Sequence, residues 1–259
     1  KIKPRKGEFA VRTEDIEELL DHHGESIALI MLGGVNYYTG QVFDFKKITK
    51  YAQLKGVNVG FDLAHAAGNI NLKLHDWNVD FAVWCSYKYL NSGPGSVGGA
   101  FVHERHHSSQ IHRFSGWWGH NKEDRFKMPD KFNPIKTVEG WQLSNPPILS
   151  LAAIRSSLSI FDEVGMDKLV AKSNNLTNYL RFLLSSIEND RIEIITPKKS
   201  GCQISIRVIN GSKILFDTIT NKGVISDWRE PDVIRVAPVP LYNSYEDVYM
   251  FYNILKKLM

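Results

Sequence analysis

The chain has 259 residues, of which 43% are hydrophobic and 23% are charged, a composition typical of a globular protein rather than a disordered or fibrous one. Its formal net charge is only +4, and Lys and Arg are interspersed with Asp and Glu, which argues against nucleic acid as a partner. No apolar run approaches the roughly 20 residues of a membrane-spanning helix, so no membrane partner is expected. Two cysteines, Cys85 and Cys202, are too few for a disulfide framework, and we expect a reducing, cytoplasmic compartment.

The first part of the chain alternates between helical and strand-like segments. Thr13 is placed to cap a helix that ends near Gly24, and a second helix is expected over residues 45–55. Three short apolar runs have the length and composition of buried strands: residues 26–32, 57–62 and 81–85. This alternation predicts an α/β fold with a mainly parallel sheet flanked by helices, in which functional residues gather where strands end.

Two consecutive prolines, Pro146 and Pro147, mark a change in character and predict a domain boundary. Residues 1–145 are expected to form part of a large domain, and residues 146–259 a smaller C-terminal α+β domain. The segments expected in the smaller domain are helices over 148–161 and 169–187, strands over 192–195, 204–208 and 233–236, and a last helix from Ser244.

The residues that follow the second and third predicted strands can carry cofactor chemistry. A lysine amine such as that of Lys88 can form a Schiff base with the aldehyde of pyridoxal 5′-phosphate (PLP). A carboxylate such as Asp62 can keep the pyridine nitrogen protonated, so that the ring accepts electrons from the substrate. His65 can orient that carboxylate or lie over the ring, and Tyr87 can contact the phosphate or relay a proton. A single Asp at a strand end is more often a turn residue and a single Lys a surface residue, so the hypothesis depends on their order and spacing.

A competing motif lies in His103-Glu104-Arg105-His106-His107, which fits the zinc-protease pattern His-Glu-x-x-His. That pattern requires both histidines on one face of a helix. Here it follows a strand-like run, and no apolar period of 3.6 residues surrounds it. We therefore expect a solvated loop and no metal site.

Two further features can contact a ligand. Trp117 and Trp118 stand between glycines and fit either a core or a binding wall with an N–H donor. Arg235 alternates with apolar neighbours, so it fits a surface position of a strand, yet its guanidinium can also hold a carboxylate through two hydrogen bonds.

Five segments together resemble kynureninase, a PLP enzyme of fold type I, and the resemblance extends over essentially the whole chain in the family's order. These segments are Gly60-Phe61-Asp62-Leu63-Ala64-His65-Ala66, Trp84-Cys85-Ser86-Tyr87-Lys88-Tyr89-Leu90-Asn91, Gly116-Trp117-Trp118-Gly119-His120, Ser144-Asn145-Pro146-Pro147, and the run from Ile234 to Asn243. The resemblance implies hydrolysis of the Cβ–Cγ bond of L-kynurenine or 3-hydroxykynurenine, which gives L-alanine and an anthranilate, within tryptophan catabolism and NAD biosynthesis.

The resemblance also implies roles for the cofactor contacts. Lys88 would be the Schiff-base lysine and would remove the α-proton, and Asp62 would pair with the pyridine nitrogen. His65 and Tyr87 would contact the cofactor, Tyr87 at the phosphate and in proton transfer.

The remaining implied roles concern the phosphate and the substrate. Trp117 would contact the phosphate, and Asn145 would contact the cofactor or the substrate, both across the interface of a homodimer. Arg235 would hold the α-carboxylate of the substrate.

The sequence departs from the family's pattern in three ways. Gly33 stands where a cofactor-contacting serine is common, and Trp118 stands where a phenylalanine beside the substrate ring is common. The first part of the family's sequence, with its phosphate-binding loop, stacking aromatic and substrate-contacting histidine, has no counterpart before Lys1. If the 259 residues are the whole molecule, we expect weak PLP binding and little turnover.

Two alternatives stay open. The first is another fold-type I enzyme, such as a cysteine desulfurase-like or aminotransferase-like protein, which shares the Asp-x-x-His and Lys arrangement. The second is a truncated, inactive kynureninase-like chain that only dimerises or binds a partner.

Overall fold

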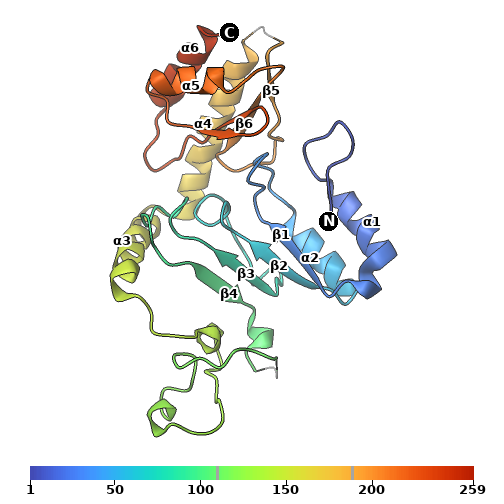
Figure 1. The fold of residues 1–259 in the computed structure, drawn as a ribbon, viewed down its shortest axis with the longest axis vertical. Helices are drawn as coiled ribbons and strands as arrows, with labels where there is room; N and C mark the ends of the chain where they lie inside the picture. The colour runs from blue at the N-terminus through green and yellow to red at the C-terminus, as the bar shows by residue number, and fades with distance from the viewer. Residues whose placement is uncertain (109–110, 188–189) are drawn as a thin grey trace.

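The computed structural model describes residues 1–108, 111–187 and 190–259, and its elements fall into two groups (Figure 1). The first group comprises α1 (Thr13–His23), β1 (Leu29–Gly33), α2 (Phe45–Leu54), β2 (Asn58–Asp62), β3 (Phe81–Trp84) and β4 (Gly99–Val102). The second group comprises α3 (Ile148–Val164), α4 (Met166–Ser185), β5 (Ile192–Ile194), β6 (Ile204–Val208), α5 (Ile214–Asn221), β7 (Asp227–Arg229), β8 (Val233–Val236) and α6 (Tyr245–Lys256).

The first sheet has the order β1-β2-β3-β4, with β1, β2 and β3 parallel and β4 antiparallel to β3. The expectation of a mainly parallel sheet is therefore confirmed. The predicted cap of α1 is wrong, because Arg12 occupies the cap position and Thr13 is already helical. The cap of α2 is Asp44, whose side chain accepts a hydrogen bond of 3.0 Å from the backbone N–H of Lys47.

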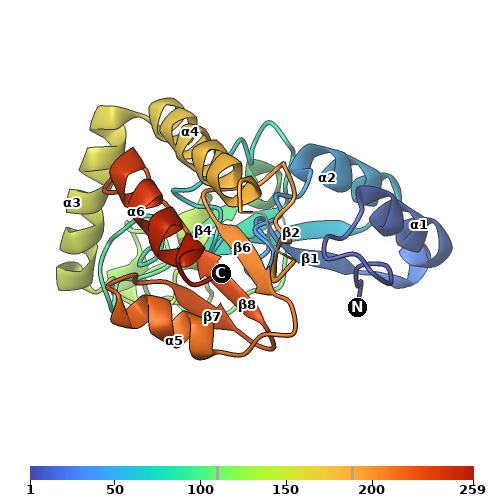
Figure 2. The ribbon, with the colours of Figure 1, turned by 90° about the horizontal axis from the view of Figure 1, so that it is seen from above.

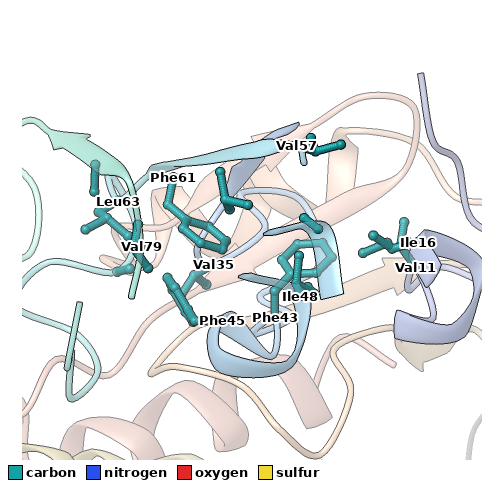
Figure 3. Packing of buried hydrophobic residues seen from close by; sticks show 14 of the residues in the cluster. Val11, Ile16, Val35, Phe43, Phe45, Ile48, Val57, Phe61, Leu63 and Val79 are labelled. Atoms are coloured by element: carbon teal, nitrogen blue, oxygen red, sulfur yellow. The ribbon is translucent and has the colours of Figure 1, made fainter. Parts of the chain in front are cut away.

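The core of the first group lies between one face of this sheet and α2 (Figure 3). Phe61 of β2 and Ile48 of α2 are completely buried, and the ring centroids of Phe61 and Phe45 are 4.4 Å apart. Removing side chains of this size from water stabilises a fold by roughly 1.5–3 kcal/mol each. The apolar face of α2 thus fixes the helix to β2, and α1 lies against the outer side of α2.

The opposite face of the first sheet is open. Leu29 and Met31 of β1 are each 45% exposed, and Val83 of β3 is 41% exposed. All three side chains point to this one side of the sheet. Asp62 belongs to the same face, because it pairs with Gly33 in one register and with Val83 in the other.

The second sheet is entirely antiparallel and has the order β5-β6-β8-β7 (Figure 2). Together with the first sheet it gives the expected α/β class with a smaller α+β part. The last helix begins where the sequence indicated: the Ser244 side chain accepts from the backbone of Asp247, whose carboxylate accepts from the Ser244 N–H. Sequence patterns missed α5 and β7, since β7 is only three residues long and alternates charged residues with Trp228.

Alternation along β6 and β8 gives the second sheet one apolar and one polar face. Ile204, Ile206 and Ile234 are buried in a core with α4 and α6. Ser205 and Arg235 point to the other face, which lies against the loop of residues 36–42.

This contact between the loop and the polar face is made of hydrogen bonds from buried side chains of the second sheet. Ser205 Oγ donates to the carbonyl oxygen of Tyr38 at 2.6 Å, and Gln203 Nε2 donates to that of Tyr37 at 3.1 Å. Gly40 lets the loop approach closely, because a Cβ there would lie 3.0 Å from the carbonyl oxygen of Gln203. We call these bonds, with the bond from Arg235 to the Tyr37 carbonyl oxygen, the polar seam.

In its described residues, the segment between β4 and α3 has only short 3₁₀ turns as helical structure, and much of it extends away from both sheets (Figure 1), although the turn Val138–Trp141 contacts β4. Its start is fixed by the buried Asp80, whose carboxylate accepts from the backbone of Val59 at 2.8 Å and contacts Arg105 and His106. Glu104–His106 is one such turn, so the His-Glu-x-x-His pattern does not lie on a helix. Among the described residues, no group of three or more His, Cys, Asp or Glu side chains could hold a metal ion.

The predicted division at residues 145 and 146 stays a prediction. Each sheet has its own apolar cluster, yet α3 also contacts the first group, since the Ser157 hydroxyl donates to the carbonyl oxygen of Leu90. No helix in the described part of the chain is long and apolar enough to cross a membrane.

Two neighbouring glycines test the packing at the end of β1. A Cβ on Gly34 would lie 2.6 Å from Phe45 Cζ and 2.8 Å from Leu63 Cδ2, whereas a Cβ on Gly33 would meet its nearest atom, the Val35 carbonyl oxygen, at 3.4 Å. We expect Gly34→Ala to lower the free energy of unfolding by about 1–3 kcal/mol and Gly33→Ala to change it by less than about 1 kcal/mol. Urea denaturation of both variants measures this, and equal losses would contradict the described packing.

Candidate active site

The candidate site lies at the carboxyl edge of the first sheet. Asp62 is the last residue of β2, and Lys88 follows the end of β3 by four residues. Because β2 and β3 are parallel neighbours, their carboxyl ends meet at the same edge. Gly33 ends β1 at this edge as the ladder partner of Asp62.

The pKa of His65 depends on burial and on the charges of Lys88, Arg235 and Asp62. Burial is the main cause that lowers the pKa of His65 to about 4, and the positive charges of Lys88 and Arg235 lower it further. The negative charge of Asp62 acts in the opposite direction. An amine, a guanidinium and a carboxylate from three separate segments therefore lie close enough to one imidazole to alter its protonation.

A local hydrogen bond orients the Asp62 side chain, whereas one ring nitrogen of His65 has no hydrogen-bond partner among the described residues. Asp62 Oδ1 accepts from the backbone N–H of Ala64 at 2.8 Å, which turns the chain back toward His65, and the side chain is otherwise exposed. Within the described residues, the buried Nδ1 of His65 has no hydrogen-bond partner. A buried ring nitrogen without a partner is typical of a site that a ligand completes.

Tyr87 stands next to Lys88 with its side chain 52% exposed. The Cys85 side chain is the main cause that raises the pKa of Tyr87, with smaller contributions from desolvation and from the negative charge of Asp62, so the phenol stays protonated and can donate. Lys88 Nζ lies 5.8 Å from the centre of the Tyr87 ring. Cys85 is a neighbour that sequence reasoning did not assign to the site.

The loop after Lys88 is held by buried hydroxyl groups. Ser86 is only 2% exposed, and its Oγ donates to the carbonyl oxygen of Val97 at 2.5 Å. The backbone N–H of Ser92 donates to the carbonyl oxygen of Ser86 at 3.1 Å. The backbone that carries Lys88 is thus closed into a compact turn rather than left as an open loop.

Arg235 reaches the site from β8 of the second sheet. Its side chain is 9% exposed and its guanidinium donates to the Tyr37 carbonyl oxygen and to the Asp227 carboxylate. Its Nε is buried and has no partner in the part of the chain that the structure describes. The guanidinium therefore has unused donor capacity.

Three predicted site residues lie elsewhere. Trp117 packs its ring against Phe126, with ring centroids 5.3 Å apart, and Trp118 lies 4.8 Å from the guanidinium of Arg125. Both tryptophans, and the exposed Asn145, belong to the segment that extends away from the sheets (Figure 1). The structure of one chain does not bring them to Lys88, and their contact across a dimer interface stays a prediction.

Asn69 is a neighbour of the site that the sequence did not indicate. Its amide donates to the carbonyl oxygen of His65 at 2.9 Å and accepts from the backbone N–H of Cys202 at 3.0 Å. Cys202 is completely buried, which raises the pKa of its thiol to about 12 and keeps it neutral. The bond between Asn69 and Cys202 spans 133 residues, so no local pattern reveals it.

These residues fit both ends of a PLP ring. An exposed carboxylate suits the protonated pyridine nitrogen, an amine suits the aldehyde, and the buried Nδ1 of His65 has no hydrogen-bond partner among the described residues. Arg235 has the chemistry to bind an amino acid carboxylate.

Comparison with solved structures defines the class of fold. A cysteine desulfurase from Escherichia coli superposes with a TM-score of 0.78 at 14% identity, covering 94% of this chain and 62% of that one. A mutant of the lyase C-DES with glycine covalently linked to its PLP cofactor gives a TM-score of 0.78 at 16% identity, covering 93% of this chain and 63% of that one. The fold is therefore that of the fold-type I PLP enzymes.

Sequence comparison is more specific. The kynureninase of Flavobacterium psychrophilum is 56% identical over 263 aligned positions, which cover 99% of this chain and 62% of that protein. Residues 169–255 match the family model of the kynureninase C-terminal domain. The chain is thus a homologue of the kynureninases, as its five segments predicted, and it spans about 62% of their length.

The lowered pKa of His65 predicts how stability depends on pH. The unfolded chain takes up a proton near the ordinary value of 6.5, whereas the folded chain does so only near 4. Protonation therefore favours the unfolded state as pH falls from about 6.5 to about 4. Urea unfolding at neutral pH and at pH about 5 should show a smaller loss of stability in His65→Gln than in the unchanged chain. An NMR titration of His65 near its ordinary pKa would contradict the described burial.

Proposed function

We propose that the chain carries the Lys88-centred part of a kynureninase active site, and that the complete enzyme hydrolyses L-kynurenine or 3-hydroxykynurenine to L-alanine and anthranilate or 3-hydroxyanthranilate. The single observation that carries this proposal is that Asp62 and Lys88 lie at the ends of neighbouring parallel strands, beside a half-buried His65 whose Nδ1 has no hydrogen-bond partner among the described residues. Homology to kynureninases over 99% of the chain supports it.

The cofactor of the proposed site is PLP, which when bound would withdraw electrons from the α-carbon of the substrate. Lys88 would hold it covalently through its amine and would later accept the α-proton. Asp62 would use its exposed carboxylate oxygen to bind the pyridine nitrogen. His65, neutral at physiological pH, would contact the ring without adding positive charge beside Lys88.

The other side chains would bind the ends of the ligands. Tyr87, with its protonated phenol, would donate to the phosphate or return a proton. Arg235 would bind the α-carboxylate. In a homodimer, Trp117 would contact the phosphate of the partner's site, and Asn145 would contact its cofactor or substrate. Trp118 would lie beside the substrate ring. Gly33 leaves space beside Asp62, so a cofactor contact there could come only from its backbone.

The proposal includes a cytoplasmic location, which rests on two free cysteine thiols, and a role in tryptophan catabolism and NAD biosynthesis. It also includes the division into a PLP-binding part over 1–145 and a small domain over 146–259.

One observation favours a second candidate, a chain that binds PLP weakly by itself. The sheet face that carries Asp62 exposes Leu29, Met31 and Val83, so the described residues leave one side of the site uncovered. In that case the chain would supply half of a site and depend on further residues for turnover.

Covalent attachment of PLP tests the role of Lys88. We expect the chain mixed with PLP to absorb at about 420 nm and, after borohydride reduction, to carry the added mass on Lys88. Lys88→Ala should lose both signals. Lys73→Ala, which removes an exposed lysine outside the site, should keep them. Labelling of Lys73 and Lys88 to the same extent would contradict the assignment.

Release of fluorescent anthranilate from L-kynurenine tests the reaction. The complete enzyme should release it, and Asp62→Asn should lower kcat by at least about 100-fold with a smaller change in KM, because the carboxylate acts on the ring rather than on the substrate. A complete, PLP-loaded enzyme that releases no anthranilate would exclude kynureninase activity.

A further inference from the structure

Two arginines share one carboxylate on the polar face of the second sheet. Asp227 of β7 pairs with Arg235 of β8, and Arg229 lies on the same face two residues beyond Asp227. Asp227 Oδ2 accepts from Arg229 Nη2 at 2.9 Å and also from Arg235 Nη2. Two positive charges are therefore balanced by one negative charge.

Arg207 provides an internal comparison on the same face. Its guanidinium contacts two carboxylates, Asp232 at 2.8 Å and Glu193 at 3.4 Å, so its charge is more than balanced. The cluster of Asp227, Arg229 and Arg235 has two cations and one anion, so one of its positive charges is not balanced.

Arginine N–H groups without hydrogen-bond partners also indicate that the cluster lacks an anion. Arg235 is nine-tenths buried, and neither its Nε nor the buried Nε of Arg229 has a hydrogen-bond partner among the described residues. A buried donor without a partner costs stability unless a ligand completes it.

The cluster lies on the face of the second sheet that contacts the loop of residues 36–42, because Arg235 donates to the Tyr37 carbonyl oxygen. This loop follows β1, which ends at the same sheet edge as Asp62. An anion that entered between the two guanidiniums would therefore lie on the side of the second sheet that contacts the loop after β1.

We propose that Asp227 determines the specificity of this carboxylate site. It holds Arg235 when no ligand is bound, and by neutralising one of the two guanidiniums it sets the site to accept one carboxylate and to disfavour a second negative charge. This inference rests on the proposed function, because it deepens the role given to Arg235 there. It assigns Arg229 to the same site as the second cation.

The physical reason is repulsion between Asp227 and the ligand. One ligand carboxylate against Arg235 restores neutrality, since two cations then face two anions. A second acidic group would add a third anion beside the buried Arg235, and no further cation of the cluster would offset its repulsion from Asp227. An amino acid with an uncharged side chain meets this requirement, and an acidic amino acid does not.

Glutamine and glutamate are matched probes, because they have the same shape and differ by one negative charge. Titration of the 259-residue chain, labelled with ¹⁵N at arginine, follows the Nε–H signals of Arg229 and Arg235. We expect L-glutamine to bind more tightly than L-glutamate. Asp227→Asn should tighten binding of L-glutamate by about tenfold and that of L-glutamine by less, so that the preference disappears.

Asp232→Asn is the control, since it removes a carboxylate from Arg207 on the same face and should leave both dissociation constants unchanged. Arg229→Gln tests the idea independently if Asp227→Asn fails to fold. It removes one cation, so it should weaken both ligands and increase the preference for L-glutamine.

An unchanged preference in Asp227→Asn, or an equal weakening of both ligands, would overturn the proposal and leave Asp227 as a support for Arg235. Arg235→Gln separates this failure from that of the proposed function. If it binds both amino acids as tightly as the unchanged chain, the role of Arg235 itself is wrong.

Discussion

The arrangement of the site depends on the polar seam between the loop of residues 36–42 and the second sheet. The carbonyl groups of Tyr37 and Tyr38 accept from Gln203, Ser205 and Arg235, and the three donor side chains are at most 9% exposed. A buried donor that lost its acceptor would cost about 1–3 kcal/mol. The seam therefore holds the polar face of the second sheet against the first group of elements, and the apolar face is left to α4 and α6.

This seam gives the site its electrostatic character. It places the guanidinium of Arg235, on β8, near the imidazole of His65, which follows β2. The hydrogen bond between Asn69 and Cys202 joins the same two regions independently. Burial keeps His65 neutral, so it adds no positive charge to a site that already contains Lys88 and two arginines. The carboxylate of Asp227 partly balances the two arginines, and the carboxylate of Asp62 lies at the carboxyl edge of the first sheet.

The open face of the first sheet explains why the reaction is assigned to a complete enzyme. Leu29, Met31 and Val83 are exposed beside Asp62, and apolar patches of this kind usually contact another segment or subunit. The chain spans about 62% of the kynureninases that it matches. The contacts proposed for Trp117 and Asn145 in a homodimer would come from the segment between β4 and α3, where both residues are exposed.

The sequence by itself determined the class of fold, the strands at whose carboxyl ends Asp62 and Lys88 lie, and the kynureninase homology. Each of these depends on local information: apolar periodicity, residues at strand ends, and a capping box such as that of Ser244 and Asp247. Only the tertiary structure decided that β4 runs antiparallel, that Asn69 contacts Cys202, and that Asp227 and Arg229 share the site of Arg235. These contacts join residues that are far apart in the chain or lie in strands too short to show a period. They follow from the pairing and packing of whole sheets, which no local pattern encodes.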